Sequence, residues 1–230
     1  MVVAGDIDIP TTKKMVADYF GSIPRGAAIE RNLSMEDPIT TAIEAKAYDP
    51  NIQIPAVVTA YRTPSFKSRD SRVLDMISTY LSDGPSSKLY KKLVDDKKMA
   101  LQTGAFNISQ EDYSMYVVFG LPQGDNKLED LVSEMDEEIV KIQKELISER
   151  DYQKILNKFE NGFVNANASV EGIANSLARY HMLYGDTSLI NNEIDIYRSI
   201  TREEIRDVAN KYLNPNQRLV LEYLPESKEN

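Results

Sequence analysis

Hydrophobic and polar positions change period along the chain, and the change separates strands from helices. Two strand-like stretches, Ala42–Tyr48 and Ile52–Tyr61, are joined by the turn signal Asp49-Pro50-Asn51. A second pair, Ala100–Ser109 and Tyr113–Leu121, is separated by three polar residues. The second strand of this pair has one wholly apolar face and one face that is about half apolar. The first face consists of Tyr113, Met115, Val117 and Phe119, and the second of Ser114, Tyr116 and Val118.

Apolar residues at helical spacing fill most of the rest of the chain. They predict helices at 71–81, from Ser86 or Ser87 to about Lys97, and at 128–146, 148–165, 169–184 and 201–212. The last of these begins with the capping box Thr201-Arg-Glu-Glu204, and Arg218–Leu224 is a final strand before a solvated tail. Strands in adjacent pairs and helices in blocks predict an α+β fold, a mostly antiparallel sheet with helices packed on one face.

The first forty residues have a different organisation. Met1–Asp6 has the pattern of a buried strand, and a helix follows from Pro10 until Gly21 stops it. Residues 24–41 carry prolines and a glycine with no sustained period, which is typical of a linker. We therefore expect a strand and helix over 1–23, a linker over 24–41 and the main domain over 42–230. A buried strand at the first residue indicates a piece of something longer.

Charge and cysteine content exclude several classes of function. The chain has 230 residues, with 27 basic and 36 acidic side chains, and a net charge of −9. Such a chain is not expected to bind nucleic acid, which requires clustered basic residues. The absence of cysteine removes thiol catalysis, disulfides and cysteine-ligated metal sites. No apolar run approaches the roughly 20 residues that span a bilayer, so no membrane span is predicted.

Candidate chemistry is sparse. His181 is the only histidine, and a His-x-x-Glu-His zinc site needs two, so we predict no metal ligand and no catalytic residue in this chain. A carboxylate site for Mg²⁺ or Ca²⁺ stays open, although no EF-hand loop is present. Gly84, Ser86 and Ser87 lie at a predicted helix start, where backbone amides can hold an anion or a peptide carbonyl. Helix capping is the favoured interpretation of the two serines.

Several short sequence segments resemble the insulinase/pitrilysin family of zinc metallopeptidases, in its mitochondrial-processing-peptidase-like branch. Val2-Val-Ala-Gly-Asp6 and Phe20-Gly-Ser-Ile-Pro-Arg25 resemble the close of that family's first half. The resemblance continues through the second half, at 55–64, 81–90, 93–101, 152–163, 176–186 and 200–213.

The resemblance implies a fold of the mitochondrial-processing-peptidase type and a division of labour between two halves. The family's first half holds zinc through His-x-x-Glu-His and a downstream Glu, with the motif Glu as general base. The second half closes a chamber around an extended peptide substrate. This chain then corresponds to the strand and helix that end a first half (1–23) and a complete, non-catalytic second half (42–230). Zinc is expected in the parent and no cofactor in this fragment.

One departure from the family concerns substrate binding. Many second halves carry an Arg and, seven residues on, a Tyr that contact substrate, and the aligned positions here are Val94 and Leu101. The loss is compatible with a zinc-bearing parent whose homologous partner subunit supplies the pair in a dimer, beside the parent's N-terminal catalytic half. It is equally compatible with a parent that is degenerate in both halves. The alternative is a scaffold protein of the same fold without protease activity. A bacterial periplasm and a cytoplasm both stay open as the compartment.

Overall fold

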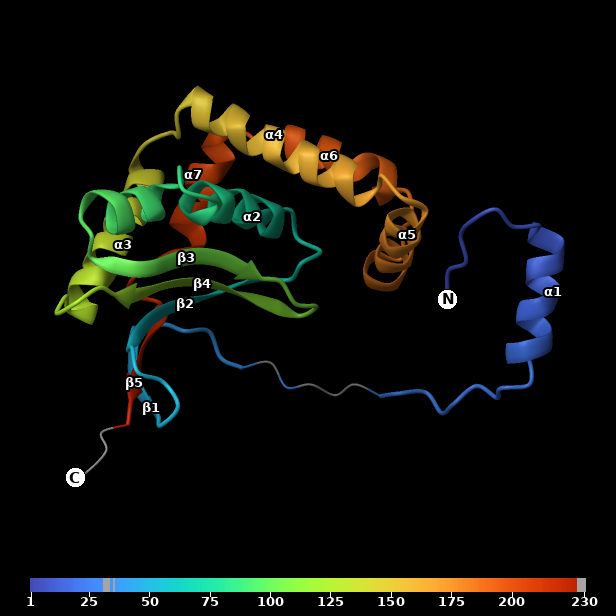
Figure 1. Cartoon of the computed structure of the whole chain (residues 1–230), viewed down its shortest axis with the longest axis horizontal. Helices are drawn as coiled ribbons and strands as arrows, with labels where there is room; N and C mark the ends of the chain where they lie inside the picture. Colours follow the sequence, from blue (N-terminus) through green and yellow to red (C-terminus); the bar gives the residue numbers. More distant parts are fainter. Residues whose placement is uncertain (31–33, 35, 227–230) are drawn as a thin grey trace. The chain divides into compact units, whose positions relative to one another are not determined.

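The chain forms helices and a five-stranded sheet, shown in Figure 1. A computed structural model describes residues 1–30, 34 and 36–226. The elements are α1 (Ile9–Phe20), β1 (Ile43–Asp49), β2 (Ala56–Pro64), α2 (Arg69–Ser82), the π-helix η1 (Tyr90–Asp96), β3 (Ala100–Ile108), β4 (Tyr113–Pro122), α3 (Leu128–Lys144), α4 (Glu149–Ala166), α5 (Val170–Tyr184), α6 (Leu189–Arg198), α7 (Arg202–Tyr212) and β5 (Arg218–Pro225). Residues 31–33 and 35 of the predicted linker, and 227–230 of the predicted tail, lie outside the described residues.

The elements divide into two compact units. One consists of Met1–Asp37 and Gly162–Asn191, and the other of Pro38–Asn161 and Asn192–Asn230. The second unit holds the whole sheet and every residue of the main hydrophobic core.

The strand order is β1-β5-β2-β4-β3. The predicted β3–β4 hairpin is confirmed as an antiparallel pair, but the expected pairing of β1 with β2 is wrong. Instead, β5 lies between them, parallel to β1 and antiparallel to β2. The physical reason is burial: Leu219, Val220 and Leu221 suit a central strand, whereas Glu44 and Lys46 suit the edge.

The helices that build the core lie on one face of the sheet, as predicted. Buried side chains of β2 and β4, such as Tyr61 and Tyr116, face α2 and α3. A side chain added at Gly120 of β4 would meet Leu131 of α3, which shows how closely this helix approaches the strand. Helix α7 joins the same layer because it packs against α2 and α3.

Two segments between the strands differ from the sequence expectation. The helix predicted from Ser86 or Ser87 is a short turn at Lys88 and Leu89 that continues as the π-helix η1, and its start has no side-chain cap. Helix α6 was not predicted from the sequence at all. Its Glu193 is buried, which obscures the apolar stripe that predicts a helix.

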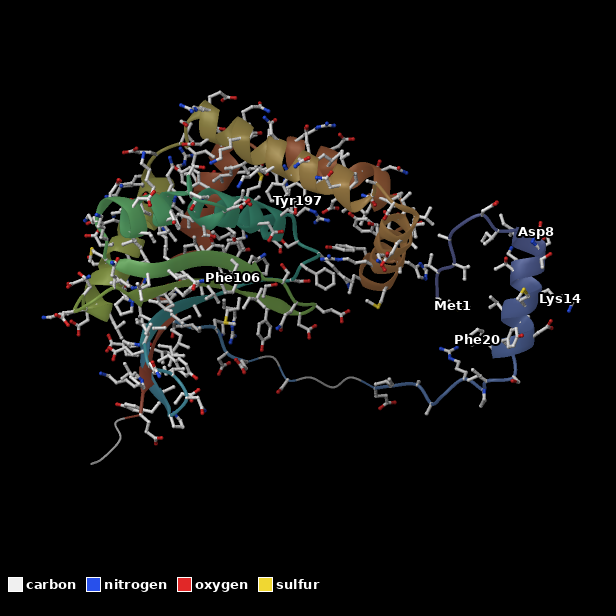
Figure 2. The ribbon with its side chains drawn as sticks, in the orientation of Figure 1. Met1, Asp8, Lys14, Phe20, Phe106 and Tyr197 are labelled. Atoms are coloured by element: carbon white, nitrogen blue, oxygen red, sulfur yellow. The ribbon has the colours of Figure 1, made fainter. Side chains whose placement is uncertain are left out.

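The predicted amino-terminal strand is also absent. Residues 1–8 form no strand, because none of the described strands pairs with them and an unpaired strand leaves its backbone groups unsatisfied. Helix α1 is confirmed, and the Asp8 side chain caps it by accepting from the Thr11 amide at 2.9 Å. The helix buries no residue, and Tyr19 and Phe20 stay exposed. Phe20 is labelled near the end of the helix in Figure 2.

Candidate functional site

The loop that carries Gly84 and Ser86 is fixed to helix α4 by lysines. Lys158 Nζ lies 2.7 Å from the Asp83 carboxylate and donates to the Asp83 carbonyl at 2.8 Å. Lys154 donates to the Ser86 hydroxyl. Gly84 has a φ of +82°, a conformation that a glycine adopts without steric cost. The structure therefore places Gly84 and Ser86 next to Lys154 and Lys158, a contact that the sequence analysis did not predict.

Ser87 does not act as the expected cap. Its hydroxyl is buried and has no hydrogen-bond partner among the described atoms. Its amide donates to the Gly84 carbonyl at 3.0 Å, so this N–H is committed within the loop. The local geometry gives the loop a structural role, and a contact with substrate stays a prediction.

The two positions aligned with the family's Arg and Tyr lie on neighbouring elements. Val94 is on η1, half-buried against the core. Leu101 is 50% exposed at the start of β3, where the β3–β4 register shifts between Ala100 and Gln102. Neither side chain donates a hydrogen bond or carries charge.

A cluster of partly buried charged residues, Asp75, Arg72 and Glu193, lies between α2, β3 and α6. The sequence analysis did not predict it. The Asp75 carboxylate accepts from Asn107 Nδ2 at 3.1 Å and from the Tyr197 hydroxyl at 3.2 Å. Burial raises the pKa of Asp75 to about 6, because the lost hydration outweighs both hydrogen bonds. Nearby, Arg72 and Glu193 form a buried bidentate ion pair at 2.7 and 3.0 Å. These contacts lock α6 to α2.

The face of the sheet opposite the helices is apolar. Side chains alternate along each strand, so the neighbours of the buried Tyr61 and Tyr116 point away from α2 and α3. We call this surface the open face; it consists of Val58, Ala60, Phe106, Met115, Val117, Phe119, Leu219 and Leu221. Phe106 and Met115 are 42% and 41% exposed. The wholly apolar face predicted for β4 is therefore the one turned away from the core helices.

Two charged residues lie on the same side by the pairing register, Arg62 opposite Met115 and Asp49 on the edge strand β1. The Arg62 guanidinium carbon lies 4.7 Å from the centre of the Tyr113 ring. On the open face, Ala60 and Val117 are buried among their neighbours, and Arg62 lies at one end beside the exposed Met115.

Among the described residues, no set of donors fits a zinc ion. His181 is exposed on α5, and no group of three or more His, Cys, Asp or Glu residues able to hold a metal exists within the described part of the chain. No helix in residues 1–30, 34 and 36–226 combines the length and the apolar character needed to cross a bilayer.

Comparison with known proteins places this arrangement in context. The model of the peptidase M16 inactive domain matches residues 1–159. The chain is 25% identical over 226 residues to the zinc protease PqqE of Helicobacter pylori, covering 94% of this chain and 49% of that protein. The chain therefore spans about half the length of the curated relative it matches.

Solved structures share the fold. A protease from Helicobacter pylori superposes with a TM-score of 0.88 at 24% identity, over 96% of this chain and 54% of that one. A peptidase M16 inactive domain from Pseudomonas fluorescens gives a TM-score of 0.79 at 11% identity, over 98% and 53% of the two chains. At these identities the similarity demonstrates the fold.

Proposed function

Because the chain belongs to the peptidase M16 family through its inactive domain, the insulinase-type family expected from the sequence, we propose that it is the non-catalytic C-terminal part of a zinc metalloendopeptidase. In this role it forms a wall of the chamber that encloses a peptide substrate and a surface for assembly. The observation that carries the proposal is a family match over residues 1–159 in a chain with one histidine and no cysteine. Zinc and the general base then lie in an N-terminal half of the parent.

The proposal assigns residues 1–23 to that preceding half, 24–41 to a linker and 42–230 to the C-terminal domain. Its support is that α1 buries no side chain although its apolar residues are helically spaced. Ile9, Met15 and Phe20 are all more than half exposed, and a helix with such a stripe gains stability by packing against another surface.

The proposal also includes a homologous subunit that supplies the substrate-contacting Arg and Tyr. Its support is that Val94 and Leu101 occupy the two aligned positions, and their side chains can make neither a hydrogen bond nor an ion pair. A substrate carbonyl or carboxylate at these positions would therefore need donors from another chain.

Metal analysis and peptide cleavage test the proposal. The isolated chain, dialysed and analysed for metal, is expected to retain no stoichiometric zinc and to leave unstructured fluorogenic peptides uncut. When the chain is mixed with the separately produced N-terminal half of its parent and with the homologous subunit, cleavage should appear, and a chelator should return it to background. Zinc is required because it lowers the pKa of its bound water to near 7 and so generates the nucleophile.

A variant of the N-terminal half with the motif Glu replaced by Gln is the matched control, and should remain inactive in the mixture. Stoichiometric zinc with chelator-sensitive cleavage in the isolated chain would contradict the proposal. A parent without His-x-x-Glu-His, inactive after mixing, would favour the scaffold alternative.

A further inference from the structure

Six polar side chains line a shallow groove of about 490 Å³ along helix α4: Arg150, Gln153, Lys154, Asn157, Lys158 and Asn161. Three of them are cations spaced four residues apart, and the other three are uncharged amides with the same spacing. Each set forms a row along the helix, because residues four apart lie one above the other. No carboxylate is among the described residues that line the groove, although the whole chain carries a net charge of −9.

The cations of this groove keep most of their charge. Within the described part of the chain, Arg150 has no ion-pair partner, and its side chain is exposed. Lys154 donates to the Ser86 hydroxyl, which is uncharged and does not neutralise the ammonium group. Lys158 has a carboxylate partner, Asp83, at 2.7 Å. Three cations and one carboxylate therefore leave two positive charges at the groove.

Contacts to the neighbouring loop order the two lysines. Their hydrogen bonds to Asp83 and Ser86 hold both ammonium groups against the segment that joins α2 to η1. An ammonium group has three donors, so each keeps at least one for a ligand. Asp151, a carboxylate that interacts with Lys154, is itself paired with Lys88 at 2.9 Å. A ligand would therefore meet cations that are already held in place, which lowers the entropic cost of binding.

The amide row offers both kinds of hydrogen-bonding group. Gln153 Nε2 donates to Asn157 Oδ1 at 3.0 Å. This bond leaves the Gln153 oxygen as an acceptor and the Asn157 nitrogen as a donor. A peptide backbone can use both, because it presents N–H and C=O groups. A phosphate group offers acceptor oxygens alone, so the amide row favours a polypeptide over a phosphate ligand.

The spacing of the cations matches that of an acidic strand. Residues four apart on a helix are about 6 Å apart along its axis. In an extended chain, side chains on the same face recur about every 6.6 Å. Three carboxylates at alternate positions can therefore contact three such cations at once, with an accumulated mismatch of about 1.2 Å that long basic side chains can absorb.

We propose that this groove on α4 binds an acidic segment of a partner protein in extended form, with carboxylates at alternate positions facing Arg150, Lys154 and Lys158. The Gln153 and Asn157 amides hydrogen-bond the main chain of the segment. Attraction between the positive groove and the acidic segment also favours their encounter. The inference goes beyond the proposed function, because it requires neither zinc nor the catalytic half.

Fluorescence anisotropy with the whole 230-residue chain tests the inference. The probe is a fluorescein-labelled peptide of alternating glutamate and serine. The control peptide has the same length and composition but repeats Glu-Glu-Ser-Ser, which places half of its carboxylates on each face of an extended chain. We expect saturable binding of the alternating peptide and about threefold weaker binding of the control, because the control cannot contact all three cations at once. High salt should weaken both, since exposed charges are screened.

Matched double variants test the residues of the groove. Arg150→Gln with Lys154→Gln should weaken binding of the alternating peptide about fivefold, because two exposed ion pairs are lost. Lys91→Gln with Arg179→Gln removes the same two charges from exposed positions outside the groove and should leave binding nearly unchanged. Matching thermal unfolding midpoints will show that both variants fold.

Charge reversal separates recognition from a structural effect. Arg150→Glu with Lys154→Glu should bind a peptide of alternating lysine and serine more tightly than the wild type does. Loss of a structural contact would not create such binding.

Equal binding of the two acidic peptides, or an equal loss in the two glutamine double variants, would overturn the inference, because net charge alone would then explain the attraction. Tighter binding of inorganic polyphosphate or of phosphatidylglycerol vesicles, lost in Arg150→Gln with Lys154→Gln, would assign the groove to phosphate groups and also overturn it. These results are independent of the proposed function, because the assay uses this chain alone whereas cleavage requires the catalytic half.

Discussion

At the scale of single residues, Asp75 shows how packing sets the behaviour of a side chain. Its carboxylate accepts hydrogen bonds from Asn107 and Tyr197, yet loss of hydration dominates and raises its pKa to about 6. The neighbouring Arg72 is already paired with Glu193 and compensates the charge only in part. The sequence around Asp75 has the pattern of an ordinary amphipathic helix. The cluster can therefore be identified only from the tertiary structure, in which α2, β3 and α6 pack together.

The raised pKa of Asp75 predicts a pH-dependent contribution to stability. Between about pH 4 and pH 6 the folded state holds a proton that the unfolded state has released, so stability from this group is present at low pH and lost as the pH rises. The free energy of unfolding of the wild type minus that of Asp75→Asn should therefore fall by about 2 kcal/mol from pH 4 to pH 7. Urea titrations at four pH values measure it.

Asp125→Asn, on an exposed turn, is the control for this experiment, and its difference from the wild type should change little with pH. A difference for Asp75→Asn that stays flat from pH 4 to pH 7 would show that Asp75 is not held in its neutral form by the fold.

At the scale of elements, helix α7 combines a local signal with distant contacts. The Thr201 hydroxyl accepts from the Glu204 amide at 3.1 Å, and the Glu204 carboxylate accepts from the Thr201 amide at 2.9 Å, which confirms the predicted capping box. Glu204 also accepts two hydrogen bonds from Arg69 at 2.7 and 3.1 Å. The same carboxylate thus starts α7 and ties it to α2.

Replacing Thr201 tests the contribution of the cap. Thr201→Ala should lower the free energy of unfolding by about 1 kcal/mol, because one amide at the helix start loses its acceptor. Thr201→Ser keeps the hydroxyl and should stay within a few tenths of a kcal/mol of the wild type. Denaturant titration of the three proteins measures the effect, and equal losses in both variants would assign it to the lost methyl group instead.

At the scale of the whole molecule, stability is concentrated in one of the two units. The main core is built entirely from residues of 38–161 and 192–226, among them Leu74, Met135 and Val208. Helix α1 contributes no buried residue. The amino-terminal segment is therefore expected to serve association with other polypeptide more than the folding of this domain.

Truncation tests this distribution. A chain that begins at Pro38 should keep a single cooperative thermal transition, with a midpoint within about 2 °C of the full chain, since no core contact is removed. It should also show less self-association, because exposed apolar residues such as Ile9 and Phe20 are gone. Calorimetry and sedimentation measure both properties. A large fall in the midpoint would show that 1–37 supports the core.

The sequence by itself determined the features that depend on near neighbours. Amphipathic spacing located most helices, the polar break between Ser109 and Tyr113 located the β3–β4 hairpin, and Thr201 with Glu204 located a helix start. The lack of a His-x-x-Glu-His motif also follows from counting, because one histidine cannot supply its two imidazoles.

Tertiary structure decided what depends on residues far apart in the chain. Insertion of β5 between β1 and β2 follows from burying Leu219 and Leu221 in mid-sheet, and no local pattern encodes a partner 157 to 176 positions away. Periodicity shows that β4 has an apolar face but not which side the helices cover, since both faces carry apolar residues. The open face could therefore be recognised only once α2, α3 and α7 had occupied the other side.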